Sequence, residues 1–252
     1  MCRHLGYLGP AVPLAALVHD PPHSLERQSY APADMRGGGT VNADGYGVGW
    51  YPAPGGPAVR YRRAGAIWSD ENLARLSRVV VSGAVLAAVR SATVGMPVVD
   101  TACAPFTDGR WLFSHNGRVA DWPGSVVDLA GALPTEALLT LDAPTDSALL
   151  WALVRARLDA GAEPAAALAD VVSEVAAAAP GSRLNLLLTD GTVLAGTTWT
   201  HSLWVRAGGG AVTLASEPLD DDPDWRELPD GHAVTADVTG VSVVDIKGMG
   251  RG

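Results

Sequence analysis

Short apolar segments joined by glycine-containing turns fill the last third of the chain and restrict its fold more than any other feature. The clearest turn is Asp190-Gly191, a dipeptide typical of two-residue β-hairpins. A hairpin places its two strands antiparallel and side by side in one sheet. The turns predict three strand pairs, at 183–189 with 192–198, 203–206 with 211–216, and 233–238 with 241–246.

Two long helices are predicted ahead of these hairpins. The first begins near Asp146, and apolar residues recur at helical spacing from there through Leu158. The second starts at Pro164, because proline is favoured in the first turn of a helix, and ends near Ala179. Shorter helices are expected at 11–18 and 69–78, and strands at 82–90 and 111–114. Helices inserted among antiparallel strands predict an α+β fold in which helices cover the outer faces of stacked sheets.

The composition agrees with one globular domain and argues against several functional classes. The chain has 252 residues and no stretch typical of a linker, so residues 2–252 are expected to form a single domain with a frayed tail at 247–252. A net charge of −9 without a run of Lys and Arg argues against a nucleic-acid partner. No apolar segment approaches the roughly 20 residues of a membrane span, and no signal peptide is evident. With two cysteines and no targeting segment, a cytoplasmic location is expected.

The start of the chain offers a nucleophile that carries its own base. Removal of Met1 is expected because the next residue, Cys2, is small, and removal leaves a thiol and a free α-amine on one residue. A free α-amine has a pKa of about 7.7–8.0 and a thiol one of about 8.5, so the amine can accept the thiol proton. Taken alone, a cysteine here is more often simply a buried residue of a first strand.

Four further segments carry polar groups or closely spaced glycines. Residues 42–51 read NADGYGVGWY, with three glycines near a predicted turn, and residues 89–95 read VRSATVG, 114–117 SHNG and 144–148 PTDSA. Taken singly, Arg90 suits an ion pair at a strand end, Asn116-Gly117 a turn, and Asp146 a helix N-cap. All of these interpretations together would make the order and identity of the segments a coincidence.

Together with MCRHLGYLG at the start and LASEPL at 214–219, these segments resemble the class II glutamine amidotransferase domain, an N-terminal nucleophile hydrolase. More narrowly, they are similar to the stand-alone amidohydrolases of ergothioneine biosynthesis. The resemblance extends from Cys2 to about Leu219. It implies a four-layer αββα sandwich of two antiparallel sheets flanked by helices, which agrees with the strands and helices predicted above. It also implies hydrolysis of γ-glutamyl-hercynylcysteine sulfoxide to glutamate and hercynylcysteine sulfoxide.

The resemblance assigns the chemical step to three residues. Cys2 is expected to attack the carbonyl carbon of a γ-glutamyl amide and form an acyl-enzyme. The oxyanion that develops needs preorganised hydrogen-bond donors. The side-chain amide of Asn116 and the backbone N–H of Gly117 suit that role.

Recognition of the γ-glutamyl group follows from its two charges, an α-carboxylate and an α-ammonium. Arg90 offers a planar guanidinium to the carboxylate, and Thr93 can add a hydroxyl donor. Asp146 supplies the charge opposite to the ammonium. The resemblance further implies that backbone near Gly45 and Gly47 lines the site.

No cofactor and no metal is expected. His19 and His23 lack partner ligands at a metal-binding spacing, and the acidic run at 220–222 does not follow the calcium-loop pattern. The expected partner is a small γ-glutamyl molecule. The sequence leaves the oligomeric state open, a homo-oligomer included.

Two other functions stay open, a glutaminase subunit that supplies ammonia to a separate synthetase and a catalytically inactive binding module of the same fold. In synthetase-linked glutaminases the substrate-binding arginine is followed by Trp, Ala, Thr and His, whereas SATV follows Arg90 here. This difference favours a site open to a γ-glutamyl compound larger than glutamine. The trimethylammonium of such a leaving group suits an aromatic wall, for which Trp50 and Tyr51 are the first candidates.

Overall fold

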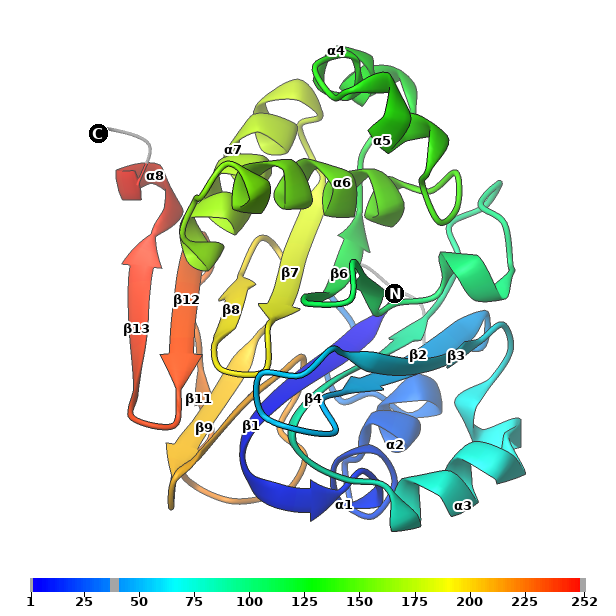
Figure 1. Ribbon diagram of the computed structural model, residues 1–252, viewed down its shortest axis with the longest axis vertical. Coiled ribbons are helices and arrows are strands. Elements are labelled where there is room, and N and C mark those ends of the chain that lie inside the picture. Colours follow the sequence, from blue (N-terminus) through cyan, green and yellow to red (C-terminus); the bar gives the residue numbers. More distant parts are fainter. Residues whose placement is uncertain (1, 37–40, 250–252) are drawn as a thin grey trace.

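The computed structural model describes residues 2–36 and 41–249. Two antiparallel sheets form the centre of the molecule, and helices cover the outer face of each sheet (Figure 1). This four-layer αββα arrangement confirms the α+β sandwich expected from the sequence. The expected loss of Met1 and the end of the tail at 250–252 lie outside the described residues.

The first sheet has seven strands in the order β11-β9-β10-β1-β4-β2-β3. Its centre is the long pair β1–β4, in which Arg3 lies opposite Val89 and Leu8 opposite Ala84. Both strands are almost continuously apolar because layers of the protein cover both faces of the sheet. The strands are β1 (Arg3–Pro13), β2 (Gly45–Trp50), β3 (Val59–Arg63), β4 (Val81–Arg90), β9 (Trp204–Gly208), β10 (Ala211–Ala215) and β11 (Arg226–Glu227).

The second sheet has six strands in the order β13-β12-β8-β7-β6-β5. The pair β6–β7 is its longest ladder, and it places Asn116 opposite Asn185. The hairpin predicted around Asp190-Gly191 is confirmed as β7–β8. The strands are β5 (Phe106–Thr107), β6 (Leu112–Arg118), β7 (Arg183–Thr189), β8 (Leu194–Thr197), β12 (His232–Asp237) and β13 (Gly240–Asp245).

Helices α6 (Asp146–Asp159) and α7 (Pro164–Ala178) pack on the outer face of the second sheet, and α1 (Ala15–Val18), α2 (Leu25–Tyr30) and α3 (Glu71–Val79) pack on the first (Figure 1). Thr145 caps α6 by accepting a hydrogen bond from the Ala148 N–H at 3.2 Å, which leaves Asp146 as the first helical residue. The remaining helices are α4 (Val127–Gly131), α5 (Thr135–Leu139) and α8 (Ile246–Met249), with 3-10 turns at Ile67–Ser69, Asp100–Ala102 and Gly124–Val126.

Each strand turns alternate side chains toward the space between the sheets and toward a helical layer. Leu86, Leu112 and Leu187 are completely buried in one cluster that joins the two sheets. Phe113 and Leu186, one residue away from two of them, pack instead against α6 and α7. The inner face of β6 therefore carries even-numbered residues, and the inner face of β7 carries odd-numbered ones.

The turn predicted for the glycine-rich segment at 42–51 is wrong. Residues Gly45–Trp50 form strand β2 and not a turn. A side chain at Gly47 would place its Cβ 2.3 Å from the carbonyl oxygen of Ala104, and one at Gly49 would meet Leu112 at 2.7 Å. The glycines are needed because neighbouring backbone and side chains pack directly against this strand.

Other boundaries also differ from the prediction. Residues 11–13 continue strand β1, so the helix expected at 11–18 is confined to Ala15–Val18. Helix α3 is capped by Asp70 and not opened by Ser69. The tail expected to be frayed forms a short helix, α8, as far as Met249. At the start of this helix the Ile246 N–H donates to the carbonyl of Gly231 at 3.0 Å.

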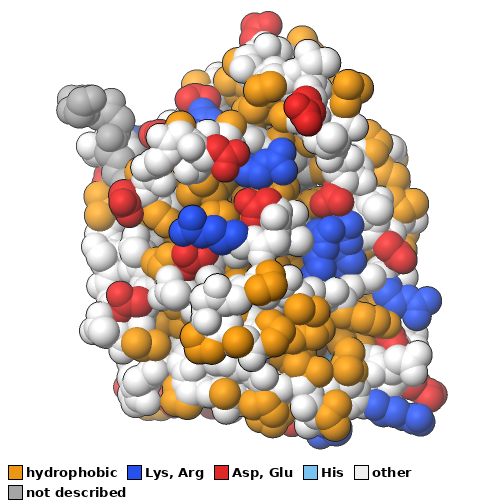
Figure 2. Space-filling view, viewed as in Figure 1, with side chains coloured by type: hydrophobic (Ala, Val, Ile, Leu, Met, Phe, Trp, Pro, Cys, Tyr) orange, Lys and Arg blue, Asp and Glu red, His pale blue; other side chains and the backbone are white. Residues whose placement is uncertain are grey.

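The surface carries a mixture of charges. Figure 2 shows acidic and basic side chains beside one another over the upper part of this face, with hydrophobic side chains gathered in its lower part. None of the helices in the described part of the chain has the length and apolar character that a membrane crossing needs.

Candidate active site

Cys2 stands immediately before β1 and is partly exposed. Its Sγ lies 3.9 Å from the carbonyl oxygen of Ser91, at the end of the neighbouring strand β4. The next residue, Arg3, is 3% exposed and forms a 2.8 Å ion pair with Glu217, whose second carboxylate oxygen accepts the Ala33 N–H. Because a buried ion pair with satisfied hydrogen bonds resists movement, Arg3 fixes the backbone that presents Cys2.

A hydrogen bond between the sheets brings the start of β1 against β6. His4 Nδ1 lies 2.8 Å from the Ser114 hydroxyl, and the His4 N–H donates to the Ser216 hydroxyl at 3.0 Å. The Asn116 side-chain amide donates to the same Ser216 oxygen at 3.4 Å. Cys2 lies two residues before His4, and Asn116 lies two residues after Ser114. The contact between His4 and Ser114 therefore places Cys2 and Asn116 on the same cleft.

A small cavity opens beside the Cys2 thiol. Cys2, Arg90, His115 and Ser147 line it, together with residues that follow β4 and precede β5. Its volume is about 20 Å³, which is room for about one water molecule. Four chain segments that are widely separated in the sequence thus place a thiol, a guanidinium, an imidazole and a hydroxyl around one space.

Asp146 reaches this cavity through its neighbour. Its Oδ2 accepts the Val119 N–H at 3.0 Å, and its Oδ1 accepts the Ser147 N–H at 2.7 Å. The Ser147 hydroxyl lies 3.0 Å from Nδ1 of His115, whose Nε2 lies 2.9 Å from the Arg183 carbonyl. A carbonyl oxygen only accepts, so we assign the proton to Nε2, and in the neutral ring Nδ1 accepts from Ser147.

Two buried histidines near the nucleophile are uncharged at neutral pH. Burial, followed by the charges of His115, His201 and Arg3, lowers the pKa of His4 well below its ordinary value. Burial, followed by Arg183 and Arg3, lowers the pKa of His201 to about 3. Neither of these two rings therefore adds positive charge to the cleft at neutral pH.

Arg90 ends β4 without the strand-end ion pair considered above. Within the described ranges no carboxylate lies within 4.0 Å of its guanidinium, which donates to the Pro97 carbonyl at 2.9 Å. Thr93 is exposed in the turn between these two residues, where its carbonyl accepts the Met96 N–H. Gly45 is the register partner of Arg90 in β2, and Gly47 lies opposite Ala88.

Asn116 and Gly117 lie inside β6, so the interpretation of this dipeptide as a turn is wrong. Asn116 is 1% exposed, and its Oδ1 has no hydrogen-bond partner among the described residues. A Cβ at Gly117 would lie 1.8 Å from the Arg183 carbonyl oxygen, so only glycine fits where β6 approaches β7.

Sequence reasoning missed His115, Ser147 and Ser216 as members of this site, although all three lie inside the quoted motifs. The aromatic residues predicted to contact the leaving group, Trp50 and Tyr51, do not line the cavity beside Cys2. Trp50 lies five residues along β2 from Gly45, about 16 Å at the usual rise of a strand. Tyr51 is 4% exposed, and its hydroxyl donates to the carbonyls of Arg110 and Thr189 beyond reach of the site.

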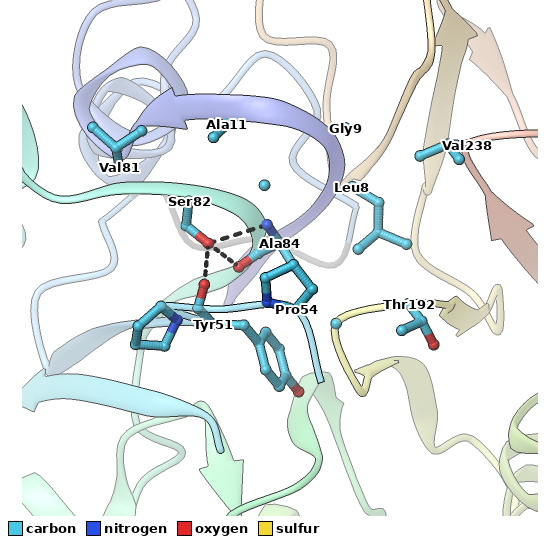
Figure 3. A pocket seen from close by; sticks show the side chains of 13 residues that line it. Leu8, Gly9, Ala11, Tyr51, Pro54, Val81, Ser82, Ala84, Thr192 and Val238 are labelled. Carbon is cyan, nitrogen blue, oxygen red and sulfur yellow. Dashed lines mark hydrogen bonds between the residues drawn. The ribbon is translucent and has the colours of Figure 1, made fainter. Parts of the chain in front are cut away.

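A cavity of about 620 Å³ lies at the opposite end of β4, eight residues from Arg90. Figure 3 shows its apolar lining, which includes Leu8 and Val238. The Ser82 hydroxyl is held by the backbone of Tyr51 and Ala84, as the dashed lines show. None of the described residues that line this cavity offers a base to the Ser82 hydroxyl, so the cavity does not provide the chemistry found at Cys2.

Among residues 2–36 and 41–249, no group of three or more His, Cys, Asp and Glu is arranged to hold a metal ion. His19 bonds to Glu26, and His23 lies 3.2 Å from Asp221. Cys103, the second cysteine, is completely buried, and burial raises the pKa of its thiol to about 11. Cys2 is thus the cysteine suited to react with a substrate.

Known proteins are similar to this chain over nearly its whole length. The family model of class II glutamine amidotransferases matches residues 14–208. The γ-glutamyl-hercynylcysteine sulfoxide hydrolase of Mycobacterium tuberculosis (strain CDC 1551 / Oshkosh) is 43% identical over 244 residues, which cover 96% of this chain and 96% of that protein. A hydrolase of the same name from Mycolicibacterium smegmatis is 43% identical over 235 residues, covering 93% and 95%.

The solved structure of a glutamine aminotransferase class-II domain protein from Silicibacter pomeroyi has the same fold. It superposes with a TM-score of 0.70 at 25% identity, and the match covers 97% of this chain and 99% of that one. The sequence match, the fold and the arrangement around Cys2 agree. The chain belongs to the class II glutamine amidotransferase family.

Proposed function

We propose that this protein is a cysteine amidohydrolase that cleaves the γ-glutamyl amide of γ-glutamyl-hercynylcysteine sulfoxide, a step of ergothioneine biosynthesis. The products are glutamate and hercynylcysteine sulfoxide. The observation that carries the proposal is the convergence of Cys2, Arg90, His115 and Ser147 on one cavity. Relatives that bear this activity in their names match almost the full length of the chain at 43% identity.

The reaction follows from the groups at the cleft. Cys2 Sγ attacks the amide carbonyl carbon, and the thiol proton passes to the α-amine that removal of Met1 exposes. Asn116 Nδ2 and the Gly117 N–H stabilise the oxyanion. The C–N bond then breaks, and the leaving amine takes the proton. Water attacks the γ-glutamyl thioester, and glutamate leaves while the Cys2 thiol is restored.

The γ-glutamyl group binds through its two charges. Arg90 has no carboxylate partner among the described residues, so its guanidinium can pair with the α-carboxylate of the substrate. Thr93 adds a hydrogen-bond donor from the turn that follows. Asp146 attracts the α-ammonium, with the Ser147 hydroxyl beside it. Backbone of Gly45 and Gly47 completes the wall next to Arg90. Because the cavity holds about one water, the lining must open to admit this group.

Comparison of two substrates tests the choice of substrate. We expect kcat/KM for γ-glutamyl-hercynylcysteine sulfoxide to exceed that for glutamine at least tenfold, measured by mass spectrometry of the glutamate released. A glutamine value equal to or above the sulfoxide value would point to a glutaminase subunit that supplies ammonia. Absence of hydrolysis with both substrates would point to an inactive binding module.

The nucleophile is tested by labelling and by mass. Iodoacetamide should modify Cys2 and abolish activity, while Cys103 stays unlabelled because its thiol is buried and its pKa is raised to about 11. Cys2→Ala should abolish turnover, with Cys103→Ala as the matched control that retains it. Intact-mass measurement should show an active protein without Met1, and quantitative retention of Met1 in active enzyme would exclude the α-amine as base.

We also propose that residues 2–252 form one domain in the cytoplasm. One buried cluster joins Leu8 and Leu86 of the first sheet to Leu112 and Leu187 of the second, which supports a common core. A reducing compartment keeps the Cys2 thiol available for catalysis.

A further inference from the structure

Two arginines face one another where the β6–β7 ladder ends. Arg118 and Arg183 are register partners, directly opposite one another on adjacent antiparallel strands. Both belong to the inner face, since β6 turns its even-numbered residues and β7 its odd-numbered residues toward the other sheet. Arg118 is exposed and Arg183 half-buried. The pair therefore stands at the mouth of the cleft between the sheets.

This arrangement is electrostatically unfavourable in the free protein. Like charges directly opposite on neighbouring strands destabilise a sheet. Burial, followed by the charge of Arg118, lowers the pKa of Arg183. Over the ranges that the structure describes, neither guanidinium has a carboxylate within 4.0 Å or donates a hydrogen bond to the protein. An anion bound between them would relieve the repulsion.

The pair is directly connected to the catalytic groups. Arg118 is two residues from Asn116 on the same face of β6, which places the two side chains about 7 Å apart along the strand. The Arg183 carbonyl accepts the His115 Nε2 hydrogen bond at 2.9 Å. Arg183 and Arg3 both lower the pKa of the buried His201, so the guanidinium charge acts on the cleft itself.

The proposed substrate carries an anion at the matching place, and the inference rests on that proposed function. Its leaving nitrogen is the α-amine of a cysteine, so an α-carboxylate sits one carbon from the bond that breaks. Glutamine releases ammonia and has no such group. We propose that Arg118 and Arg183 bind the α-carboxylate of the leaving amino acid and select γ-glutamyl amino acids over glutamine.

The chemistry of the two side chains fits this role. Guanidinium groups bind carboxylates through parallel N–H donors, and two of them can hold both carboxylate oxygens. The other end of the substrate keeps its separate guanidinium at Arg90. A substrate with one carboxylate on each side of the scissile amide would be held at both ends, which positions its carbonyl for attack by Cys2.

The test uses two ligands that differ only in the carboxylate. L-γ-glutamyl-L-alanine and γ-glutamylethylamide, its decarboxylated analogue, are titrated calorimetrically into the Cys2→Ala protein. We expect the dipeptide to bind at least tenfold more tightly. Adding Arg118→Gln or Arg183→Gln should lower that ratio about 10-fold or more, since a charge-assisted hydrogen bond is lost. Arg226→Gln, an exposed change on edge strand β11, is the matched control.

A second measurement follows turnover in the enzyme with Cys2 intact. The ratio of kcat/KM for the sulfoxide to that for glutamine should fall about 10-fold or more in Arg118→Gln and Arg183→Gln, and stay constant in Arg226→Gln. Dipeptide binding no tighter than ethylamide binding, or ratios that survive both substitutions, would overturn the assignment. Tight dipeptide binding that depends on both arginines, without hydrolysis of the sulfoxide, would refute the proposed substrate and leave the carboxylate site intact.

Discussion

Substitution of Gly117 by alanine tests whether the position of β6 sets the rate. The added Cβ would lie 1.8 Å from the Arg183 carbonyl oxygen and 2.5 Å from its carbonyl carbon. Real Cβ atoms essentially never approach closer than 3.0 Å, so β6 and β7 must separate by about 1.2 Å, the difference between the two distances. The same carbonyl holds His115, and the displaced strand carries Asn116, so both oxyanion donors move.

The expected loss can be stated in two quantities. A misplacement of about 1 Å costs on the order of 10²-fold in rate, and loss of one oxyanion donor costs about 10²–10³-fold. We therefore expect kcat to fall about 10²–10³-fold. Overpacking of about 1–3 kcal/mol should also lower Tm by about 2–12 °C in a chain of this size.

Initial rates with the sulfoxide, measured beside thermal melts, separate the two effects. Gly131→Ala is the control, because outside its chain neighbours and its own helix backbone no described atom lies within 4 Å of the Cβ it would add at the end of α4. The reasoning is refuted if Gly117→Ala keeps kcat within twofold of the unchanged enzyme. It is equally refuted if Gly131→Ala loses as much activity as Gly117→Ala.

Three further predictions use steady-state kinetics and melting curves. Asn116→Ala should lower kcat about 10²–10³-fold with little change in KM, and a rise in KM alone would contradict its role as oxyanion donor. Arg90→Lys and Asp146→Asn should each lower kcat/KM through weaker binding of the glutamyl end; if neither does, that end binds elsewhere. Burial alone would raise the pKa of Asp70, but hydrogen bonds from Tyr46, Tyr61 and two backbone N–H groups outweigh it and lower the pKa to about 2 from an ordinary 3.8. Asp70 thus stabilises the fold above about pH 4, and the deficit in Tm of Asp70→Asn at pH 7 should shrink as the pH falls toward 2; a constant deficit would exclude this linkage.

The hairpins and the two long helices could be predicted because their signals are local. Asp190-Gly191 specifies a turn by its own conformational preferences, and Pro164 marks a helix start in the same way. Strand β2 could not be predicted, because glycines such as Gly47 and Gly49 are typical of turns. Their purpose becomes visible only when Ala104 and Leu112, distant in the sequence, are packed against them.

The same distinction holds at the site. Motifs and their order predicted Cys2 and Arg90, which line one cavity, and Asn116, which donates to the Ser216 hydroxyl beside the start of β1. The partnership of His115 with Ser147 was not predictable, because it depends on how α6 meets β6. Tyr51 was chosen by its closeness to a motif in the sequence. Because 45–50 form an extended strand, residue 51 lies far from residue 45.

The arginines of the cleft separate structural charge from charge kept for ligands. Arg3 is buried and paired with the Glu217 carboxylate, so its charge is neutralised within the protein. This ion pair holds β1 in place. Arg90, Arg118 and Arg183 have no carboxylate partner in the described part of the chain, although the protein is acidic overall. Repulsion between the facing guanidiniums of Arg118 and Arg183, and the unpaired charge of Arg90 beside the Cys2 thiol, cost the free protein stability. A substrate with a carboxylate on each side of its amide recovers that cost on binding, whereas glutamine, with one carboxylate, recovers only part of it.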